Sequence, residues 1–512
     1  PYEKKTFKGG MNPYLPLWEH LPDGEPRVFE DPDNPGKYRA YIIGSHDVRY
    51  GSYCGPDIRA WSAPVEDLSN WRDEGPIFPY PIDGQWDVMY APDLVEVKRK
   101  DGKKEYYLYP HSRGWGREPL VAKGDRPDGP FEVCNWNPEN PDQTVGVLGF
   151  DPAVFVDDDG RVYGYWGFER SYAAELDPET MCTVKEGAHI IEDMVPGGQG
   201  DSLFRFFEAS SIRKINDKYI FIYSRWTKEG EFGLPTTNYT LAYAYGDAPL
   251  GPWTYGGTII DGRAREIDEN GNVIPSATAS GNTHGSICEI DGQWYVFYHR
   301  QTGLGEFARQ AMVAPITVTM EEGPGGKVSI SEGEYNSEGF SLDGLNPLEV
   351  HSAGIACWYT ATKPQQHAWP NKTFFGSYVA SSYGTEDKFD APYAIRNNTN
   401  PVVNNNDGSI VGYKYFNFTL TEGREDLQLV LDLIPEGVDG TITVMADRPW
   451  ESQGGIVLGS ANIKADMPQE ATDLHIDVPA AAALTGKHAI FLKFESEHKE
   501  KSICVLNTLL FK

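Results

Sequence analysis

The segment GFDPAVFVDDDGRVYGYWG, from Gly149 to Gly167, contains the pattern on which the fold prediction rests. It begins with an acidic phrase, continues into an apolar run, turns at an Asp-Gly pair and ends in an aromatic run. An Asp-Gly pair between two alternating apolar runs is a strong short-range signal for a β-hairpin. The segment therefore predicts two antiparallel strands with a carboxylate, Asp151, just before the first.

Four further segments within the first ~320 residues repeat this order of polar phrase, β-rich run, turn and aromatic strand. They read PDGEPRVFEDPDNPGKYRAYIIGS from Pro22, YAPDLVEVKRKDGKKEYYLYPHS from Tyr90, FFEASSIRKINDKYIFIYS from Phe206 and NTHGSICEIDGQWYVFYHR from Asn282. With Asp151, the leading polar residues are Asp23, Asp93, Glu208 and His284.

These leading residues lie about 57 to 76 residues apart, a spacing that suits four-stranded blades joined by long loops. In a β-propeller the first strand of each blade lines the central channel, so the starts of these strands converge. We therefore predict a five-bladed β-propeller over residues 1–325, with four carboxylates and a histidine near one end of its channel.

The composition changes after about residue 325, where EEGPGGKVSISEGEYNSEGF is polar and rich in turn residues. Residues 326–362 are interpreted as a linker or strap. From residue 363 to 512 alternating runs such as DGSIVGYKYFNFTL and KHAIFLKFESE return, without an amphipathic run of helical length. This pattern predicts an antiparallel β-sandwich, so the whole chain is expected to be all-β.

The charge balance limits the possible partners. The chain has 45 basic and 75 acidic residues, a net charge of −30, which argues against nucleic acid or an anionic membrane as partner. Neutral polymers such as carbohydrates remain suitable, and the 13% aromatic content fits stacking on sugars as well as packing in sheets. No apolar stretch reaches the ~18 residues of a membrane span. The sequence leaves the localisation and the oligomeric state open.

Carboxylates gathered at one funnel suit glycoside hydrolysis. That reaction needs one carboxylic acid to protonate the leaving oxygen and one carboxylate to activate water or to attack directly. A further anion nearby raises the pKa of the acid and keeps it protonated. The chain has neither a G-x-G-x-x-G phosphate loop after a strand nor a G-x-S-x-G nucleophile elbow.

In their order along the chain, the five phrases resemble those of glycoside hydrolase family 43. PDGEPRVF followed by IIGSHD, GFDPAVFVDDDG and FFEASSIRKINDKYIFIYS resemble the opening, third-blade and fourth-blade phrases of that family. The resemblance implies a five-bladed propeller that cleaves arabinosides, xylosides and related sugars with inversion. It also implies Asp23 as general base, Asp151 as modulator of the acid's pKa and Glu208 as general acid.

Two departures from the family pattern affect these roles. The Asp-Pro of the family's first blade is Asp-Gly here, followed by Glu25 and Pro26. Glu25 is therefore an alternative candidate for the general base. If Asp23 is the base, Glu25 is a candidate for holding a substrate hydroxyl. The Gly-Pro that follows the acid in the family is Ala209-Ser210 here, a change that leaves the acid in place and alters the subsite beside it.

Other polar and aromatic residues are candidates for contact with the sugar, each with a structural alternative. Asp93 either fixes a substrate hydroxyl or holds neighbouring strands, and His46 either reaches the pocket or ends a strand. Arg300 either recognises the terminal sugar or forms an internal salt bridge. Trp86, Trp115 and Trp166 are candidates for stacking on a sugar, and the alternative for each is a place in the core.

The resemblance also implies a bound cation at the position of His284, a structural calcium ion, against the alternative of a core histidine. No organic cofactor is expected. The C-terminal segments resemble a family 6 carbohydrate-binding module, in which Trp369 and Trp450 are the aromatic candidates for sugar binding. The alternative is that this sandwich only braces the propeller.

The sequence thus predicts an inverting, exo-acting glycoside hydrolase that releases α-L-arabinofuranosyl or β-D-xylosyl units from plant-type polysaccharides or oligosaccharides. The alternatives are an enzyme acting on galactofuranose or galactan, a relative of the endo-arabinanases, and a carbohydrate-binding propeller without activity. The last would be expected to lack one of the three carboxylates Asp23, Asp151 and Glu208.

Overall fold

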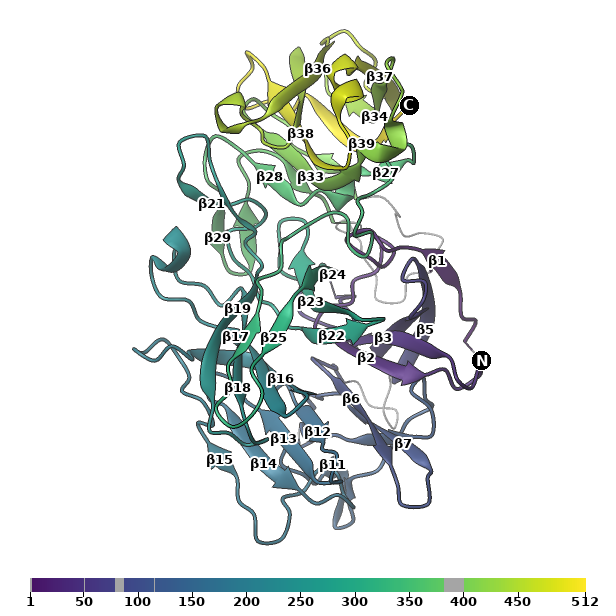
Figure 1. Cartoon of the computed structure of the whole chain (residues 1–512), viewed down its shortest axis with the longest axis vertical. Helices are drawn as coiled ribbons and strands as arrows, with labels where there is room; N and C mark the ends of the chain where they lie inside the picture. Colours follow the sequence, from purple (N-terminus) through teal and green to yellow (C-terminus); the bar gives the residue numbers. More distant parts are fainter. Residues whose placement is uncertain (1, 50, 79–86, 115, 382–399) are drawn as a thin grey trace.

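The computed structural model describes residues 2–49, 51–78, 87–114, 116–381 and 400–512. Its regular structure is almost entirely antiparallel β-sheet, with a few short 3-10 turns. In Figure 1 the strands nearest the C-terminus, green to yellow, form a layered unit at one end of the long axis. The body below them contains the earlier strands. The all-β prediction is confirmed.

Five sheets of the body form a propeller. Their first strands contact one another in a closed ring, in the order β2, β6, β12, β16, β22 and back to β2. The first blade is β1 (Thr6–Lys8), β2 (Glu25–Glu30), β3 (Tyr38–Gly44), β4 (Ile58–Pro64) and β5 (Asn70–Phe78). The second is β6 (Asp93–Lys98), β7 (Lys104–Tyr109), β8 (Ala122–Gly124) and β9 (Glu132–Val133).

The third and fourth blades have four strands each, and the fifth has three. The third is β12 (Ala153–Val156), β13 (Val162–Trp166), β14 (Tyr172–Leu176) and β15 (Ile191–Glu192). The fourth is β16 (Phe206–Ile215), β17 (Lys218–Arg225), β18 (Thr240–Gly246) and β19 (Thr254–Asp261). The fifth is β22 (Ser286–Ile290), β23 (Gln293–Gln301) and β24 (Arg309–Ile316). The prediction of five blades is confirmed, although not every blade has four strands.

Short hairpins and one 3-10 turn lie between and after the blades. They are β10 (Trp136–Asn137) with β11 (Asn140–Thr144), η1 (Glu231–Gly233), β20 (Arg265–Ile267) with β21 (Val273–Pro275), and β25 (Val318–Met320) with β26 (Val328–Ile330).

The Asp-Gly turn of the fifth repeat has the backbone geometry that its residues favour. Between β22 and β23, Asp291 and Gly292 have φ of +50° and +81°. Two successive residues with positive φ are characteristic of the type I′ turn, whose twist matches that of the flanking strands. The sequence of this turn thus sets the hairpin of β22 with β23, in which Ile290 pairs with Gln293.

The ring is closed by contacts between the first and last blades. Asn12 accepts a hydrogen bond from the backbone N–H of Val313 at 3.0 Å and donates its side-chain amide to the carbonyl of the same residue at 2.5 Å. A buried cluster joins side chains of both blades, including Ile42, Trp61 and Phe297. The N-terminal segment therefore fastens the start of the propeller to its end.

The C-terminal strands form two facing antiparallel sheets. One contains β27 (His351–Ser352), β31 (Tyr378–Val379), β32 (Val402–Val403), β34 (Gln428–Pro435), β37 (Thr472–Asp477) and β39 (Cys504–Phe511). The other contains β28 (Trp358–Thr360), β33 (Ile410–Asn417), β35 (Gly440–Ala446), β36 (Ile456–Ile463) and β38 (Lys487–Glu495). The other elements in the described part of this region are the hairpin β29 (Gln366–Ala368) with β30 (Asn371–Thr373) and the turns η2 (Ala353–Ile355), η4 (Phe418–Thr421), η5 (Glu451–Gln453) and η6 (Pro479–Ala483). The predicted sandwich is confirmed.

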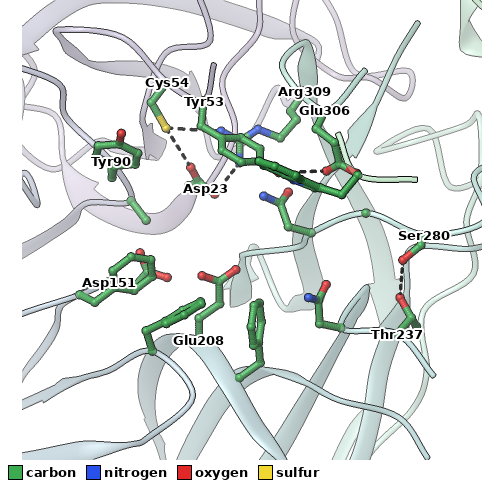
Figure 2. A pocket seen from close by; sticks show the side chains of 18 of the residues that line it. Asp23, Tyr53, Cys54, Tyr90, Asp151, Glu208, Thr237, Ser280, Glu306 and Arg309 are labelled. Carbon is green, nitrogen blue, oxygen red and sulfur yellow. Dashed lines mark hydrogen bonds and ion pairs between the residues drawn. The ribbon is translucent and has the colours of Figure 1, made fainter. Parts of the chain in front are cut away.

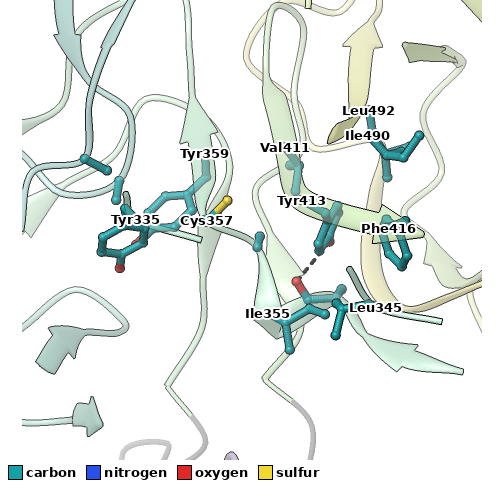
Figure 3. Packing of buried hydrophobic residues seen from close by; sticks show 14 of the residues in the cluster. Tyr335, Leu345, Ile355, Cys357, Tyr359, Val411, Tyr413, Phe416, Ile490 and Leu492 are labelled. Carbon is teal, nitrogen blue, oxygen red and sulfur yellow. Dashed lines mark hydrogen bonds between the residues drawn. The ribbon is translucent and has the colours of Figure 1, made fainter. Parts of the chain in front are cut away.

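The propeller and the sandwich share one hydrophobic core. A single buried cluster extends from Ile220 and Ile260 of the fourth blade, through Tyr359, to Val411 and Leu492 of the sandwich. Figure 3 shows its sandwich side, where the Tyr413 hydroxyl donates to the carbonyl of Ala353 at 2.9 Å. Burial of this apolar surface holds the two parts in a fixed relation.

The predicted linker, residues 326–362, contains regular structure. β26 pairs with β25 beside the propeller, whereas β27 and β28 belong to the sandwich sheets. The exact domain boundaries stay a prediction. In the part of the chain described, no helix has both the length and the apolar character needed to cross a membrane.

Candidate active site

A pocket of about 620 Å³ opens at the end of the channel where the first strands begin. Asp23, Asp151 and Glu208 all line it, and Figure 2 shows the three carboxyl groups directed into the same space. The three carboxylates singled out in the sequence, from three different blades, are therefore brought together. Part of the remaining wall is aromatic: Tyr53, Tyr90, Phe150, Phe168, Phe207, Trp226 and Trp369.

Asp23 is buried among hydrogen-bond donors and a cation. Its carboxylate accepts from Ser45 Oγ at 2.8 Å and from Arg309 Nη1 at 3.1 Å. Burial alone would raise its pKa, but the opposing effect of charged Arg309 prevails, and the pKa of Asp23 falls to about 2. Asp23 is therefore an ionised carboxylate at neutral pH.

A histidine fixes the backbone at Asp23, and another does so at Asp151. The backbone N–H of Asp23 donates to Nδ1 of His299 at 3.0 Å, and that of Asp151 to Nδ1 of His111 at 3.3 Å. Burial and the neighbouring Arg309 lower the pKa of His299 to about 3, so its ring is neutral. With Nδ1 accepting, the proton lies on Nε2, 3.0 Å from the carbonyl of Asn282.

Both aspartates have positive φ, +59° for Asp23 and +51° for Asp151. Asp tolerates this left-handed conformation better than most residues, because its short polar side chain bonds locally. The turn before each first strand thus aims the carboxylate into the channel.

Glu208 lies on an irregular part of β16. The pairing of β16 with β17 shifts register on both sides of Glu208, and the next residue, Ala209, has φ of +67°. Bulges of this kind re-aim side chains beside active sites. The Ala209 backbone N–H donates to Asp151 Oδ2 at 3.1 Å, so the bulge also connects the two carboxyl-bearing blades.

Electrostatics favour the protonated form of Glu208. Burial raises the pKa of Glu208 well above its usual range, and the charges of Asp151 and Asp23 raise it further, against a smaller opposing effect of Arg309. The pocket therefore contains one carboxyl group that keeps its proton and one, Asp23, that has lost it. Divergent pKa values of this kind are what an acid and base pair requires.

Glu25 and Asp93, both predicted to contact substrate, are not among the residues that line the pocket. Glu25 Oε1 lies 2.7 Å from Arg213 Nη2 and accepts from Ser211 Oγ at 2.8 Å. Asp93 accepts from Arg27 at 2.8 Å and from the Val154 backbone N–H at 2.8 Å, which joins the second and third blades. Both carboxylates thus hold the first strands together beneath the pocket.

His46 and Arg300 also lie outside the pocket lining. His46 is buried between Asp57 at 3.0 Å and Glu19 at 3.2 Å. Burial would lower the pKa of His46, but these two carboxylates raise it to about 9, so the ring is an internal cation. Arg300 donates to Gln310 at 3.0 Å and to the Ala356 carbonyl at 2.7 Å, and thereby connects β23 to the start of the sandwich.

The predicted tryptophans have different outcomes. Trp86 and Trp115 lie outside the described residues. Trp166 is buried in a core cluster and stacks on Tyr172 at a ring separation of 5.9 Å, as its core alternative predicted.

His284 is buried beside the carboxylates, with Nδ1 3.8 Å from Asp151 Oδ2. Within the described ranges no group of three or more His, Cys, Asp or Glu side chains is arranged to hold a metal ion. Calcium takes six to eight oxygen ligands, and an imidazole nitrogen with one carboxylate does not supply them. These side chains alone do not fit a calcium site, and the cation at His284 stays a prediction.

Several residues of the pocket were missed by the sequence reasoning. Arg309, which also contacts Asp47 at 2.9 Å, begins the run RQAMVAPITV, whose apolar character indicates a strand and no catalytic motif. One signal was available for the two histidines that support the aspartates, because His111 in YPHS follows β7 and His299 in YHR lies near the end of β23, the second strand of each repeat. Glu306 and Tyr53 lie in loops without a distinctive motif.

The two aromatic candidates of the sandwich line different cavities. Trp369 lines the carboxylate pocket, whereas Trp450 lines a separate cavity of about 810 Å³ between the sandwich and the loops of the fourth blade. They do not form one binding face, and the likeness to a family 6 module stays a prediction.

Comparisons with known proteins found a family model and several relatives. The family model described as glycosyl hydrolases family 43 matches residues 29–324. A protein of Thermoclostridium stercorarium named xylosidase/arabinosidase is 33% identical over 436 residues, covering 80% of this chain and 83% of the relative. An arabinoxylan arabinofuranohydrolase of Paenibacillus polymyxa is 29% identical over 336 residues, covering 59% of this chain and 48% of the relative.

Among solved structures, a family 43 arabinoxylan arabinofuranohydrolase of Bacillus subtilis, in complex with cellotetraose, is 20% identical with a TM-score of 0.47. The match covers 98% of this chain and 97% of that one.

Proposed function

Because this chain belongs to glycosyl hydrolases family 43 and is therefore a glycoside hydrolase, we propose that it releases terminal α-L-arabinofuranosyl or β-D-xylosyl units from arabinoxylan-type substrates. The proposed reaction inverts the anomeric configuration. Glu208 is the proposed acid, Asp23 the proposed base and Asp151 the residue that keeps the acid protonated.

The observation that supports the proposal best is that two carboxyl groups in one pocket have pKa values shifted in opposite directions. The pKa of Asp23 falls to about 2 beside Arg309, whereas burial, Asp151 and Asp23 hold the pKa of Glu208 far above its ordinary range. At neutral pH the pocket thus contains a proton donor and a proton acceptor.

In the proposed mechanism Glu208 donates its proton to the glycosidic oxygen as the bond to the anomeric carbon breaks. Asp23 accepts a proton from a water molecule, whose oxygen attacks the same carbon from the opposite face. After departure of both products, Glu208 regains a proton from solvent and Asp23 loses one. Asp151 accepts a hydrogen bond from the Ala209 backbone N–H, and its negative charge keeps the proton on Glu208.

The substrate class is supported by the names of the relatives. The Thermoclostridium stercorarium relative, of which the match covers 83%, is named xylosidase/arabinosidase. The Paenibacillus polymyxa relative is named arabinoxylan arabinofuranohydrolase. The aromatic wall is consistent with this class, because aromatic side chains combine apolar area with defined stacking geometry.

A panel of 4-nitrophenyl glycosides, together with arabinoxylan oligosaccharides, tests the proposal. We expect turnover of the α-L-arabinofuranoside, the β-D-xyloside or both, and release of single sugars from the oligosaccharides. Turnover of galactofuranosides alone, or production of internal fragments alone, would contradict it.

A further inference from the structure

A hairpin that follows strand β28 of the sandwich enters the pocket of the propeller. It consists of β29 and β30, and two of its residues, His367 and Trp369, line the pocket with the three carboxylates. The propeller therefore does not form the pocket alone.

A buried carboxylate of the propeller fixes the hairpin. Glu306, in the loop between β23 and β24, contacts His367 Nε2 at 2.6 Å and Lys372 Nζ at 3.1 Å. Its other oxygen accepts from Gln301 at 2.9 Å and from the Tyr53 hydroxyl at 3.2 Å. A buried lysine and a buried glutamate tolerate burial only when paired, so this arrangement favours one position of the hairpin.

The tip of the hairpin presents Trp369 at the mouth of the pocket. Trp369 is 66% exposed, yet its indole N–H donates to the Tyr53 hydroxyl at 2.9 Å. The Tyr53 ring in turn lies 4.9 Å from the guanidinium of Arg309, which pairs with Asp23. A large aromatic ring that is both anchored and exposed at a pocket edge is a typical binding surface.

The position of Trp369 indicates which part of a substrate it meets. In an exo-acting enzyme the released unit lies among the carboxylates, and the rest of the substrate extends through the mouth. Trp369 lines the pocket together with the three carboxylates and is 66% exposed, so its ring lies where the pocket opens to solvent. A ring held at this rim is placed to meet the sugar that remains after cleavage.

We propose that Trp369 forms the leaving-group subsite, where it stacks on the sugar residue that carries the unit to be released. The C-terminal part of the chain thereby supplies part of the substrate site. Glu306 and Lys372 are positioning residues that act through the hairpin. This inference rests on the proposed function above.

The test compares Trp369→Ala with the full-length wild-type enzyme on two substrates. One is an oligosaccharide such as xylotetraose or its arabinosylated form, and the other is the glycosyl fluoride of the released sugar, which has no leaving-group sugar. We expect kcat/KM to fall about tenfold or more on the oligosaccharide, the loss of about 1.4 kcal/mol of binding. On the glycosyl fluoride, kcat/KM of Trp369→Ala should stay within about twofold of the wild-type value.

Two further variants separate stacking from other effects. Trp369→Phe keeps a ring but loses the N–H donor, and it should recover most of the oligosaccharide activity. Tyr38→Ala removes another exposed aromatic side chain, 47% exposed and absent from the pocket lining, and should match wild type on both substrates.

Unchanged oligosaccharide kinetics in Trp369→Ala, or equal losses on both substrates, would overturn the inference. If the wild type cleaves neither substrate, the proposed function fails. In that case, calorimetric titration of xylotetraose into wild type and Trp369→Ala tests the inference independently of the proposed function. A loss of affinity of about tenfold supports it, and equal affinities overturn it.

Discussion

Replacing Asp151 by asparagine should move the alkaline limb of the pH–activity profile to lower pH. Burial and the charge of Asp151, followed by that of Asp23, hold the pKa of Glu208 above its ordinary range. Removing an anion makes ionisation of Glu208 easier, so its proton is lost at a lower pH. Asparagine has the same shape, and its carbonyl oxygen can still accept from the Ala209 N–H that Asp151 accepts at 3.1 Å.

The expected magnitude follows from the order of these causes. A like charge a few ångströms away shifts a carboxyl pKa by about 1 to 3 units. Because burial is the largest cause and Asp23 also contributes, we expect Asp151→Asn to lower the alkaline limb by about 1 to 2 units. Each unit corresponds to about 1.4 kcal/mol.

The assay is kcat/KM between about pH 4 and 10, on an unactivated oligosaccharide that needs a proton on its leaving group. Asp158→Asn is the matched control, since Asp158 lies in a turn with its side chain 85% exposed. An alkaline limb that stays in place, or moves to higher pH, in Asp151→Asn would refute the reasoning. A limb that moves equally in Asp158→Asn would do the same.

The remaining predictions concern the proposed acid and base. Glu208→Gln should nearly abolish turnover of unactivated oligosaccharides and retain part of it on a dinitrophenyl glycoside, which needs little protonation; near-normal oligosaccharide turnover would remove Glu208 from its role. Asp23→Asn should abolish turnover on both, with partial recovery by added azide, because activation of water is still required. Glu25→Gln should keep kcat on activated substrates, yet lower the free energy of unfolding in urea by about 3 kcal/mol by breaking a buried pair with Arg213. An inactive Glu25→Gln beside an active Asp23→Asn would transfer the base to Glu25.

The sequence predicted the propeller well because its signals are local. Each repeat contains an Asp-Gly or similar turn between alternating runs, and the pairing of β12 with β13 or β22 with β23 depends on those few residues. Repetition then sets the ring, and with it the meeting of Asp23, Asp151 and Glu208.

The supports of the site could not be predicted in this way, because they depend on contacts between distant segments. Asp23 pairs with Arg309, 286 positions away, and Glu306 with Lys372, 66 positions away. No periodicity in the sequence marks such pairs. Position within a repeat also did not determine what Glu25 and Asp93 contact. A carboxylate at a strand start can pair with an arginine below the pocket as well as bind a substrate.

The stereochemistry of the first product tests the central claim most directly. A proton NMR spectrum recorded during the first minutes of hydrolysis of a β-D-xyloside or α-L-arabinofuranoside shows which anomer forms before mutarotation. If Asp23 activates water opposite Glu208, the inverted anomer appears first, and the retained one grows in only by mutarotation. Early appearance of the retained anomer would mean that a carboxylate attacks the sugar directly, and would contradict the account.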